Sequence, residues 1–161
     1  MSVSYTETLE GSRLLRAAPG PRHEAILSRL HECVRSSVAD LKSTLLLTPR
    51  AEIHISNGTT LCPDLSLVTV ATGKLWLAAE VVSSEDHRPD TFIKKQIYDA
   101  IKLPRLWMID PRYDNDQIYH GTPYGLPLKD TLAARELLTE KLLPEFQISI
   151  AELFAAPAKS S

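Results

Sequence analysis

Apolar side chains recur at helical spacing over residues 22–41, at positions 26, 27, 30, 33, 34, 38 and 41. This spacing predicts an amphipathic helix with one buried stripe, and the breaker AAPGPR at 17–22 introduces it. His23 lies four residues before Leu27, so it points toward the buried stripe, whereas Glu24 falls at the edge of that stripe.

Several strands are predicted after this helix. Residues 51–70, AEIHISNGTTLCPDLSLVTV, read as two strands about an Asn57–Gly58 turn. Residues 74–82, KLWLAAEVV, are apolar on both parities, which is typical of a central strand covered on both faces. Residues 105–111 form another predicted strand, and a short one is predicted about Ile118 and Tyr119.

Helix signals flank the later strands. Pro89 and Asp90 break the chain and cap a predicted helix over residues 91–102. Near the C-terminus Ser149 is followed three residues later by Glu152, the capping-box pattern of a helix start. Residues 131–141, TLAARELLTEK, fit a helix or an extended segment, because periodicity alone does not decide between them. The order of elements predicts an α/β domain, in which helices pack on a mixed sheet.

The composition is that of an ordinary globular protein. The 161 residues suit one domain, are 43% hydrophobic and carry a formal net charge of −2. No apolar run approaches the ~18 residues that span a bilayer, so no membrane partner is expected. Cys33 and Cys62 have neither metal-knuckle nor disulfide-framework spacing, and the first residues hold no apolar signal-peptide core. A reduced, cytoplasmic compartment is therefore expected.

Charge is uneven along the chain. Residues 12–50 hold seven arginines and lysines against three acids, whereas the chain as a whole is slightly acidic. The overall charge argues against a constitutive polyanion binder, although a basic segment can face phosphates. A solvated helix face is the simpler interpretation of this segment.

Inside the predicted central strand, Glu80 is the only charge between Lys74 and Glu85. Alternation places Trp76, Ala78 and Val82 on the same face as Glu80. A desolvated carboxylate there is protonated or paired, and Asp64 on the preceding strand is its neighbour if the two strands are adjacent. Two carboxylates that converge in a cleft favour a hard cation such as Mg²⁺. A purely structural pair between Glu80 and an arginine or lysine is an equally good interpretation.

Helical geometry separates two adjacent lysines. At ~100° per residue, Lys94 lies on the side of Ile97, Tyr98 and the inward stripe, whereas Lys95 lies beside Asp99 on the wet side. A lysine that points at the sheet needs an acidic partner or a functional charge to meet. Lys94 is therefore the better candidate for a site.

The segments CPDLSLV, LAAEVVSSEDHRPD, KKQIYDAIKLPRLWMIDP and LLPEFQISIAELF together resemble the Uma-two family, a bacterial group of restriction-endonuclease-like proteins. The resemblance runs from about His23 to Phe154. It implies the PD-(D/E)xK nuclease fold, a mixed central sheet flanked by helices. It further implies a core at about 22–154, an N-terminal arm at 1–21, a disordered tail at 155–161, and an extended rather than helical ELLTEKLLPEF.

The resemblance also assigns residues. Asp64 matches the metal-binding aspartate of the family and Glu80 its strand glutamate. The wider superfamily carries a lysine two residues after the glutamate, where this chain has Val82. The Uma-two pattern instead carries its lysine on the following helix, four residues before a tyrosine, and in this chain these residues are Lys94 and Tyr98. His23 matches a histidine near the start of the first helix. Ser83-Ser84-Glu85 and KLPRLW depart from the usual pattern without removing a ligand.

The resemblance implies a metal-dependent endonuclease that hydrolyses phosphodiester bonds in nucleic acid, expected to be DNA. Asp64, Glu80 and the Val81 backbone carbonyl would hold Mg²⁺ or Mn²⁺, Lys94 would assist the attacking water, and His23 or Glu24 would complete the site. Double-strand cleavage would require a homodimer. Two alternatives stay open: a non-catalytic module of the same fold that binds nucleic acid or protein, and a structural carboxylate–lysine cluster in an unrelated α/β domain.

Overall fold

The protein is described as a computed structural model over residues 3–83 and 87–156. Its elements, in chain order, are β1 (Tyr5–Leu9), β2 (Ser12–Arg16), α1 (Pro21–Val38), β3 (Thr44–Leu46), β4 (Ile53–Ser56), β5 (Thr59–Leu61), β6 (Leu65–Thr69), β7 (Leu75–Val81), the π-helix η1 (Pro89–Lys94), α2 (Lys95–Ala100), β8 (Arg105–Asp110), β9 (Asn115–His120), β10 (Leu128–Ala133), β11 (Leu137–Glu140), β12 (Leu143–Ser149) and α3 (Ile150–Phe154).

A six-stranded sheet in the order β10-β9-β8-β7-β6-β3 forms the centre of the molecule. β7 and β8 pair in parallel through the η1–α2 crossover, and the other pairs are antiparallel. A smaller sheet, β2-β1-β5-β4, and the β11–β12 hairpin complete the fold. The predicted mixed sheet with flanking helices is confirmed. None of the described helices is long and apolar enough to cross a membrane.

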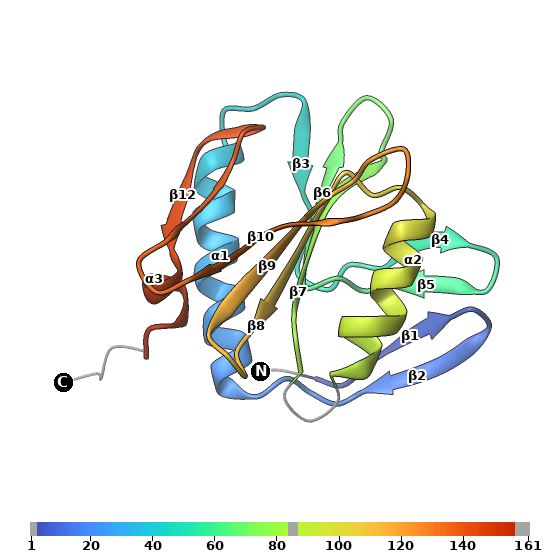
Figure 1. Ribbon diagram of the computed structural model, residues 1–161. Helices are drawn as coiled ribbons and strands as arrows, with labels where there is room; N and C mark the ends of the chain where they lie inside the picture. The colour runs from blue at the N-terminus through green and yellow to red at the C-terminus, as the bar shows by residue number, and fades with distance from the viewer. Residues whose placement is uncertain (1–2, 84–86, 157–161) are drawn as a thin grey trace.

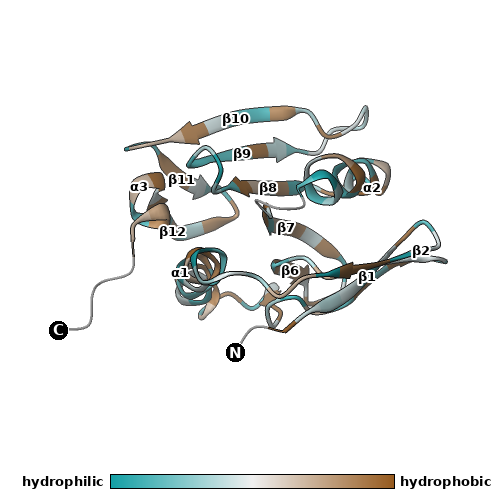
Figure 2. Cartoon of the chain, turned by 90° about the horizontal axis from the view of Figure 1, so that it is seen from below, coloured by the Kyte–Doolittle hydropathy of each residue, from teal (hydrophilic) through white to brown (hydrophobic). Residues whose placement is uncertain are grey.

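Two apolar cores lie on opposite faces of the central sheet. One face is covered by α1, α3 and β12, and there Trp107 stacks on Phe146 with 5.3 Å between ring centroids. The other face is covered by α2 and by the sheet that contains β1, and its centre includes Tyr98 and Leu61. Figure 2 shows the strands of the central sheet side by side between these two layers. β7 is buried on both sides, as its apolar sequence predicted.

Most of the predicted elements are present. The helix expected at 22–41 is α1, the Asn57–Gly58 turn joins β4 to β5, and the segment from 137 to 149 is extended. The predicted capping box is also present, because the Ser149 hydroxyl accepts a hydrogen bond of 3.1 Å from the Glu152 amide.

One prediction about β7 is wrong. Trp76 was expected on the face of Glu80, but it packs against the core beneath α1, on the other face. The cause is an irregularity in the β6–β7 ladder, where Leu67 pairs with Leu77 but Val68 pairs with Leu75. A bulge of this kind adds one residue to a strand and reverses its alternation from that point.

The N-terminal residues also differ from expectation. Where an arm was expected at 1–21, β1 and β2 form a hairpin, and β1 pairs with β5. Its turn has positive φ at Glu10 (51°) and Gly11 (86°), the geometry of a type I′ hairpin turn. From residue 157 onward, the expected tail at 155–161 lies outside the described residues.

The helix predicted over residues 91–102 begins earlier, at Pro89, and Asp90 is not its N-cap. Pro89 is the first residue of η1, so Asp90 lies inside the helix and does not cap it. The two oxygens of the Asp90 carboxylate instead accept hydrogen bonds from the two terminal nitrogens of Arg16, Oδ1 from Nη1 at 3.0 Å and Oδ2 from Nη2 at 2.9 Å. This ion pair joins the hairpin to the start of η1.

Candidate active site

Glu80 lies near the carboxyl end of β7 on the face covered by α2, with only 2% of its surface exposed. Its carboxylate forms an ion pair with Lys94 and accepts a 2.6 Å hydrogen bond from the Tyr98 hydroxyl. Burial raises the pKa of Glu80 to about 8, even though the charge of Lys94 acts in the opposite direction. Glu80 is therefore a carboxyl group that can exchange a proton near neutral pH.

Lys94 is fully buried, as helical geometry predicted, and Lys95 lies nearer the surface with its ammonium 4.8 Å from the centre of the Tyr119 ring. The Lys94 Nζ lies 2.7 Å from Glu7 and 4.0 Å from Asp90 in addition to its contact with Glu80. Burial alone would lower its pKa, but these three acids raise the pKa of Lys94 above its ordinary value. Lys94 is thus held as a cation.

Asp64 connects to the same edge of the sheet from the start of β6. Its Oδ2 accepts a 2.8 Å hydrogen bond from the Val81 amide, the residue next to Glu80. Its Oδ1 faces Arg50 Nε at 3.0 Å and His23 Nε2 at 3.3 Å. Burial alone would raise the pKa of Asp64, but the contact with His23 and the charge of Arg50 hold this pKa below its ordinary value. Asp64 is therefore an anion at neutral pH.

The first helix reaches this edge with its N-terminal turn. His23 contacts Asp64 directly, and Glu24 forms an ion pair with the Arg50 guanidinium that also binds Asp64. The structure thus brings Asp64, Val81 and His23 into direct contact, and it links Glu24 to them through Arg50. Glu80 and Lys94 form the adjoining half of the same edge.

Sequence reasoning missed several members of this cluster. Glu7 on β1 is fully buried and accepts hydrogen bonds of 2.7 Å from Arg16 and from the Cys62 amide. Arg16 in turn binds Asp90. The available signals were weak, since Glu7 alternates with threonines in YTETL and arginines are common near strands. Arg50 was counted only as part of a basic segment.

The cluster contains more buried carboxyl groups than buried cations. Its buried acids are Glu7, Asp64, Glu80 and Asp90, and the cations buried with them are Lys94 and Arg16. Carboxylate oxygens in such surplus suit a hard divalent cation. Within residues 3–83 and 87–156, no three His, Cys, Asp or Glu side chains are arranged to hold a metal ion. The ligand set expected from the sequence has only two such side chains, Asp64 and Glu80, together with the Val81 backbone carbonyl, so a search for three side chains does not test it.

Two comparisons with known proteins bear on this arrangement. A crystal structure titled as a putative nuclease belonging to DUF820 from Anabaena variabilis superposes with a TM-score of 0.77 at 16% identity, covering 93% of this chain and 89% of that chain. It shows that the fold is shared. No curated protein matches the sequence. The Uma2 family model, described as "Putative restriction endonuclease", matches residues 6–151, which is most of the chain including the hairpin. The protein therefore belongs to the Uma2 family.

Proposed function

We propose that the protein is a metal-dependent nuclease that hydrolyses phosphodiester bonds, with Asp64, Glu80 and Lys94 as its catalytic residues. The observation that supports this most is the hydrogen bond from the Val81 amide to Asp64. It holds the ionised Asp64 carboxylate next to β7 at the residue that follows Glu80, so the two carboxyl groups lie at the same edge of the sheet. Lys94 adds a buried cation to the same edge. The family description supports the coarser activity, that of a nuclease.

The atoms that would bind a metal ion are all oxygens, which are the ligands that hard cations prefer. Asp64, Glu80 and the Val81 carbonyl offer oxygen atoms, and Mg²⁺ commonly takes one or two carboxylates and keeps waters at its other positions. When bound, Mg²⁺ or Mn²⁺ would polarise the scissile phosphate and lower the pKa of a coordinated water. The surplus of buried acids supports this proposal, since an added cation would offset their repulsion.

The protein's own residues divide the remaining work. Lys94 is held protonated by three acids, so it acts as a donor that orients water or stabilises negative charge on the phosphate, and it does not act as a base. Glu80 is assigned as a ligand of the cation, and without a cation burial raises its pKa to about 8. His23 and Glu24 are accessory residues that keep Asp64 and Arg50 in place.

The first test measures cleavage with isosteric variants. Incubated with Mg²⁺ or Mn²⁺, the wild-type protein is expected to nick supercoiled plasmid and to cut single-stranded DNA circles. Asp64→Asn and Glu80→Gln keep the shapes of the side chains but replace a carboxyl group with an amide, and each is expected to lower the rate at least ~100-fold, as for loss of one electrostatic contact to a transition state. Asp130→Asn, an exposed carboxylate on β10, is the matched control. Cleavage that is equal in all four proteins would indicate a contaminant.

A second candidate is a non-catalytic binding module, and one observation favours it. The Asp64 carboxylate is already bound by the Val81 amide, Arg50 and His23, so these groups compete with a cation for its oxygen atoms. Calorimetric titration with Mn²⁺ distinguishes the two functions. Binding by the wild type that is lost in Asp64→Asn supports the nuclease, whereas binding of nucleic acid without Mn²⁺ binding or cleavage supports the module. The expected homodimer stays a prediction.

A further inference from the structure

A cavity of about 440 Å³ adjoins the carboxylate cluster. Its walls come from the β1–β2 hairpin, the link at 17–20, the first turn of α1 and the two residues that follow β7. These segments meet at the lower edge of Figure 1, where the carboxyl end of β7 also lies. His23 lines the cavity and contacts Asp64, while Arg16 lines it and contacts Glu7 and Asp90. A ligand in the cavity would therefore lie beside the proposed catalytic residues.

The charge of this cavity suits a phosphate. Among the described residues that line it there is no aspartate or glutamate, whereas Arg16, Arg22 and His23 all contribute. Arg22 is 56% exposed and keeps its place through Asp114 at 2.5 Å and the Pro111 carbonyl at 3.3 Å. In a chain whose net charge is −2, this cationic lining next to a buried acidic cluster is a local feature and does not follow from composition.

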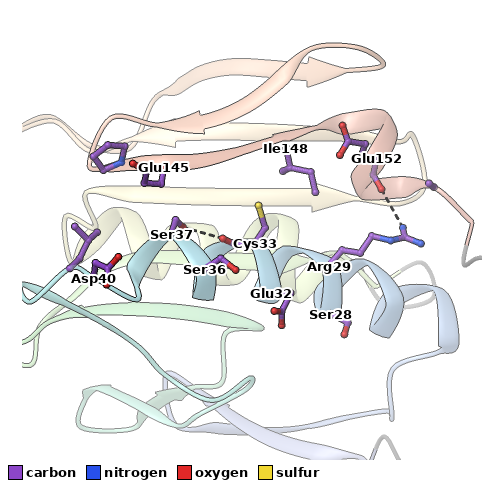
Figure 3. A pocket seen from close by; sticks show the side chains of 13 residues that line it. Ser28, Arg29, Glu32, Cys33, Ser36, Ser37, Asp40, Glu145, Ile148 and Glu152 are labelled. Carbon is purple, nitrogen blue, oxygen red and sulfur yellow. Dashed lines mark hydrogen bonds between the residues drawn. The ribbon is translucent and has the colours of Figure 1, made fainter.

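A larger cavity of about 1230 Å³ has the opposite character. Figure 3 shows it between α1 and β12, where Glu32, Asp40, Glu145 and Glu152 are spread along its length and Arg29 is the only arginine among its described lining residues. Repulsion from four carboxylates makes this groove a poor place for a polyanion. The smaller cavity is thus the better candidate for the substrate.

Size and surface restrict what the smaller cavity can hold. Small-molecule sites range over ~300–1,000 Å³, so a cavity of about 440 Å³ suits one nucleotide. Tyr5 and the exposed Leu15 supply apolar surface for a base or sugar, and Arg22 supplies a partner for its phosphate. A nucleotide that is stacked and paired in a duplex has to leave the stack before it can enter a pocket of this kind.

We propose that this cavity binds one unpaired nucleotide next to the phosphodiester bond that is cut, and that the substrate class is single-stranded or locally unpaired nucleic acid. The inference rests on the proposed nuclease function for the position of the bond. Binding in the cavity itself does not depend on cleavage. Arg22 contacts phosphate in this assignment, and the 17–20 link contributes only alanine, proline and glycine to the cavity wall.

The test is equilibrium binding in EDTA, so that no cleavage occurs. Fluorescence anisotropy of a fluorescein-labelled single-stranded 12-mer and of the same sequence as a duplex gives the two affinities at one fixed salt concentration. The single strand is expected to bind at least ~10-fold more tightly than the duplex, because pairing and stacking hold the bases away from the cavity. Ala18→Trp places a large ring on the cavity wall and fills part of the cavity, and Arg22→Gln removes the charge-assisted contact with phosphate. Each is expected to weaken single-strand binding ~10-fold.

Matched controls separate binding from folding. Ala18→Ser keeps the cavity open, and Arg135→Gln removes one positive charge at an exposed position outside the cavity. Both are expected to bind within about 2-fold of wild type, a range well below the effect of a lost charged contact. Equal affinity for duplex and single strand, or an Ala18→Trp variant that binds like Ala18→Ser, would overturn the proposal. Selective binding without any cleavage would overturn only the nuclease function, and cleavage of fully paired DNA by Ala18→Trp at the wild-type rate would overturn only the cavity assignment.

Discussion

Replacing Lys94 with methionine is expected to lower the free energy of unfolding by about 3–5 kcal/mol at neutral pH, the range for breaking a buried ion pair by removing one partner. The methionine fills a similar volume but leaves Glu7, Glu80 and Asp90 facing one another with Arg16 as their remaining buried cation. Urea denaturation followed by circular dichroism measures the change. A loss this large is a substantial share of the stability of an ordinary domain.

The neighbouring lysine provides the control for this prediction. Lys95→Met removes the same charge from the adjoining residue, the first of α2, which lies nearer the surface and contacts the face of Tyr119, so the change is expected to stay within about 1 kcal/mol. Equal losses in the two variants would contradict the ion-pair explanation. The loss in Lys94→Met should also shrink from pH 8 to pH 5, because protonation of the stranded carboxylates in the folded state replaces the missing cation.

The two lysines show which part of the site local sequence can predict. Inside one helix, ~100° per residue fixes the direction of each side chain, so the inward position of Lys94 follows from its spacing to Tyr98. The same holds for His23 on α1 and for the Ser149 cap. In each case the relevant residues lie within one or two helical turns.

The long-range members of the cluster do not follow from local patterns. The Val81 amide reaches Asp64 because β6 and β7 pair with Leu65 opposite Ala79, a register that depends on the whole sheet. The bulge that moves Trp76 to the other face depends on that same ladder. Glu7 contacts Cys62 across 55 residues, so no window around the hairpin indicated that its carboxylate enters the site.

Another buried carboxyl group, that of Asp116, lies away from the site. Asp116 on β9 is fully buried, and within the described part of the chain neither of its oxygens has a hydrogen-bond partner. It pairs with Ile109, so it shares the face of the apolar core beneath α1. Desolvation raises the pKa of Asp116 from its ordinary 3.8 to about 8. The folded protein therefore holds this carboxyl group in its neutral form at pH 7.

That shift predicts a stabilising substitution. The pKa of Asp116 is higher in the folded than in the unfolded state, so its protonation favours the folded protein. The free energy of unfolding is therefore highest below pH 3.8, where both states are protonated, and it falls as the pH rises toward 8. At pH 7 the cost of keeping the group protonated is roughly 4 kcal/mol, from 1.36 kcal/mol per pKa unit. Asp116→Asn is isosteric and neutral at every pH, so its free energy of unfolding is expected to exceed that of wild type by about this amount at pH 7 and to match it near pH 4.

Denaturant titrations of Asp116→Asn and wild type at pH 4, 5.5, 7 and 8 measure this difference directly. Asp130→Asn is the control, because its carboxylate is exposed on the adjacent strand β10 and its loss is expected to change stability by no more than ~0.5 kcal/mol at any of these pH values. Glu80 titrates in the same range, but it is present in all three proteins, so its contribution cancels in the comparison. A difference between Asp116→Asn and wild type that stays constant from pH 4 to pH 8 would mean that Asp116 is ionised in the folded protein, and hence that a cation or an ordered water network stabilises it there.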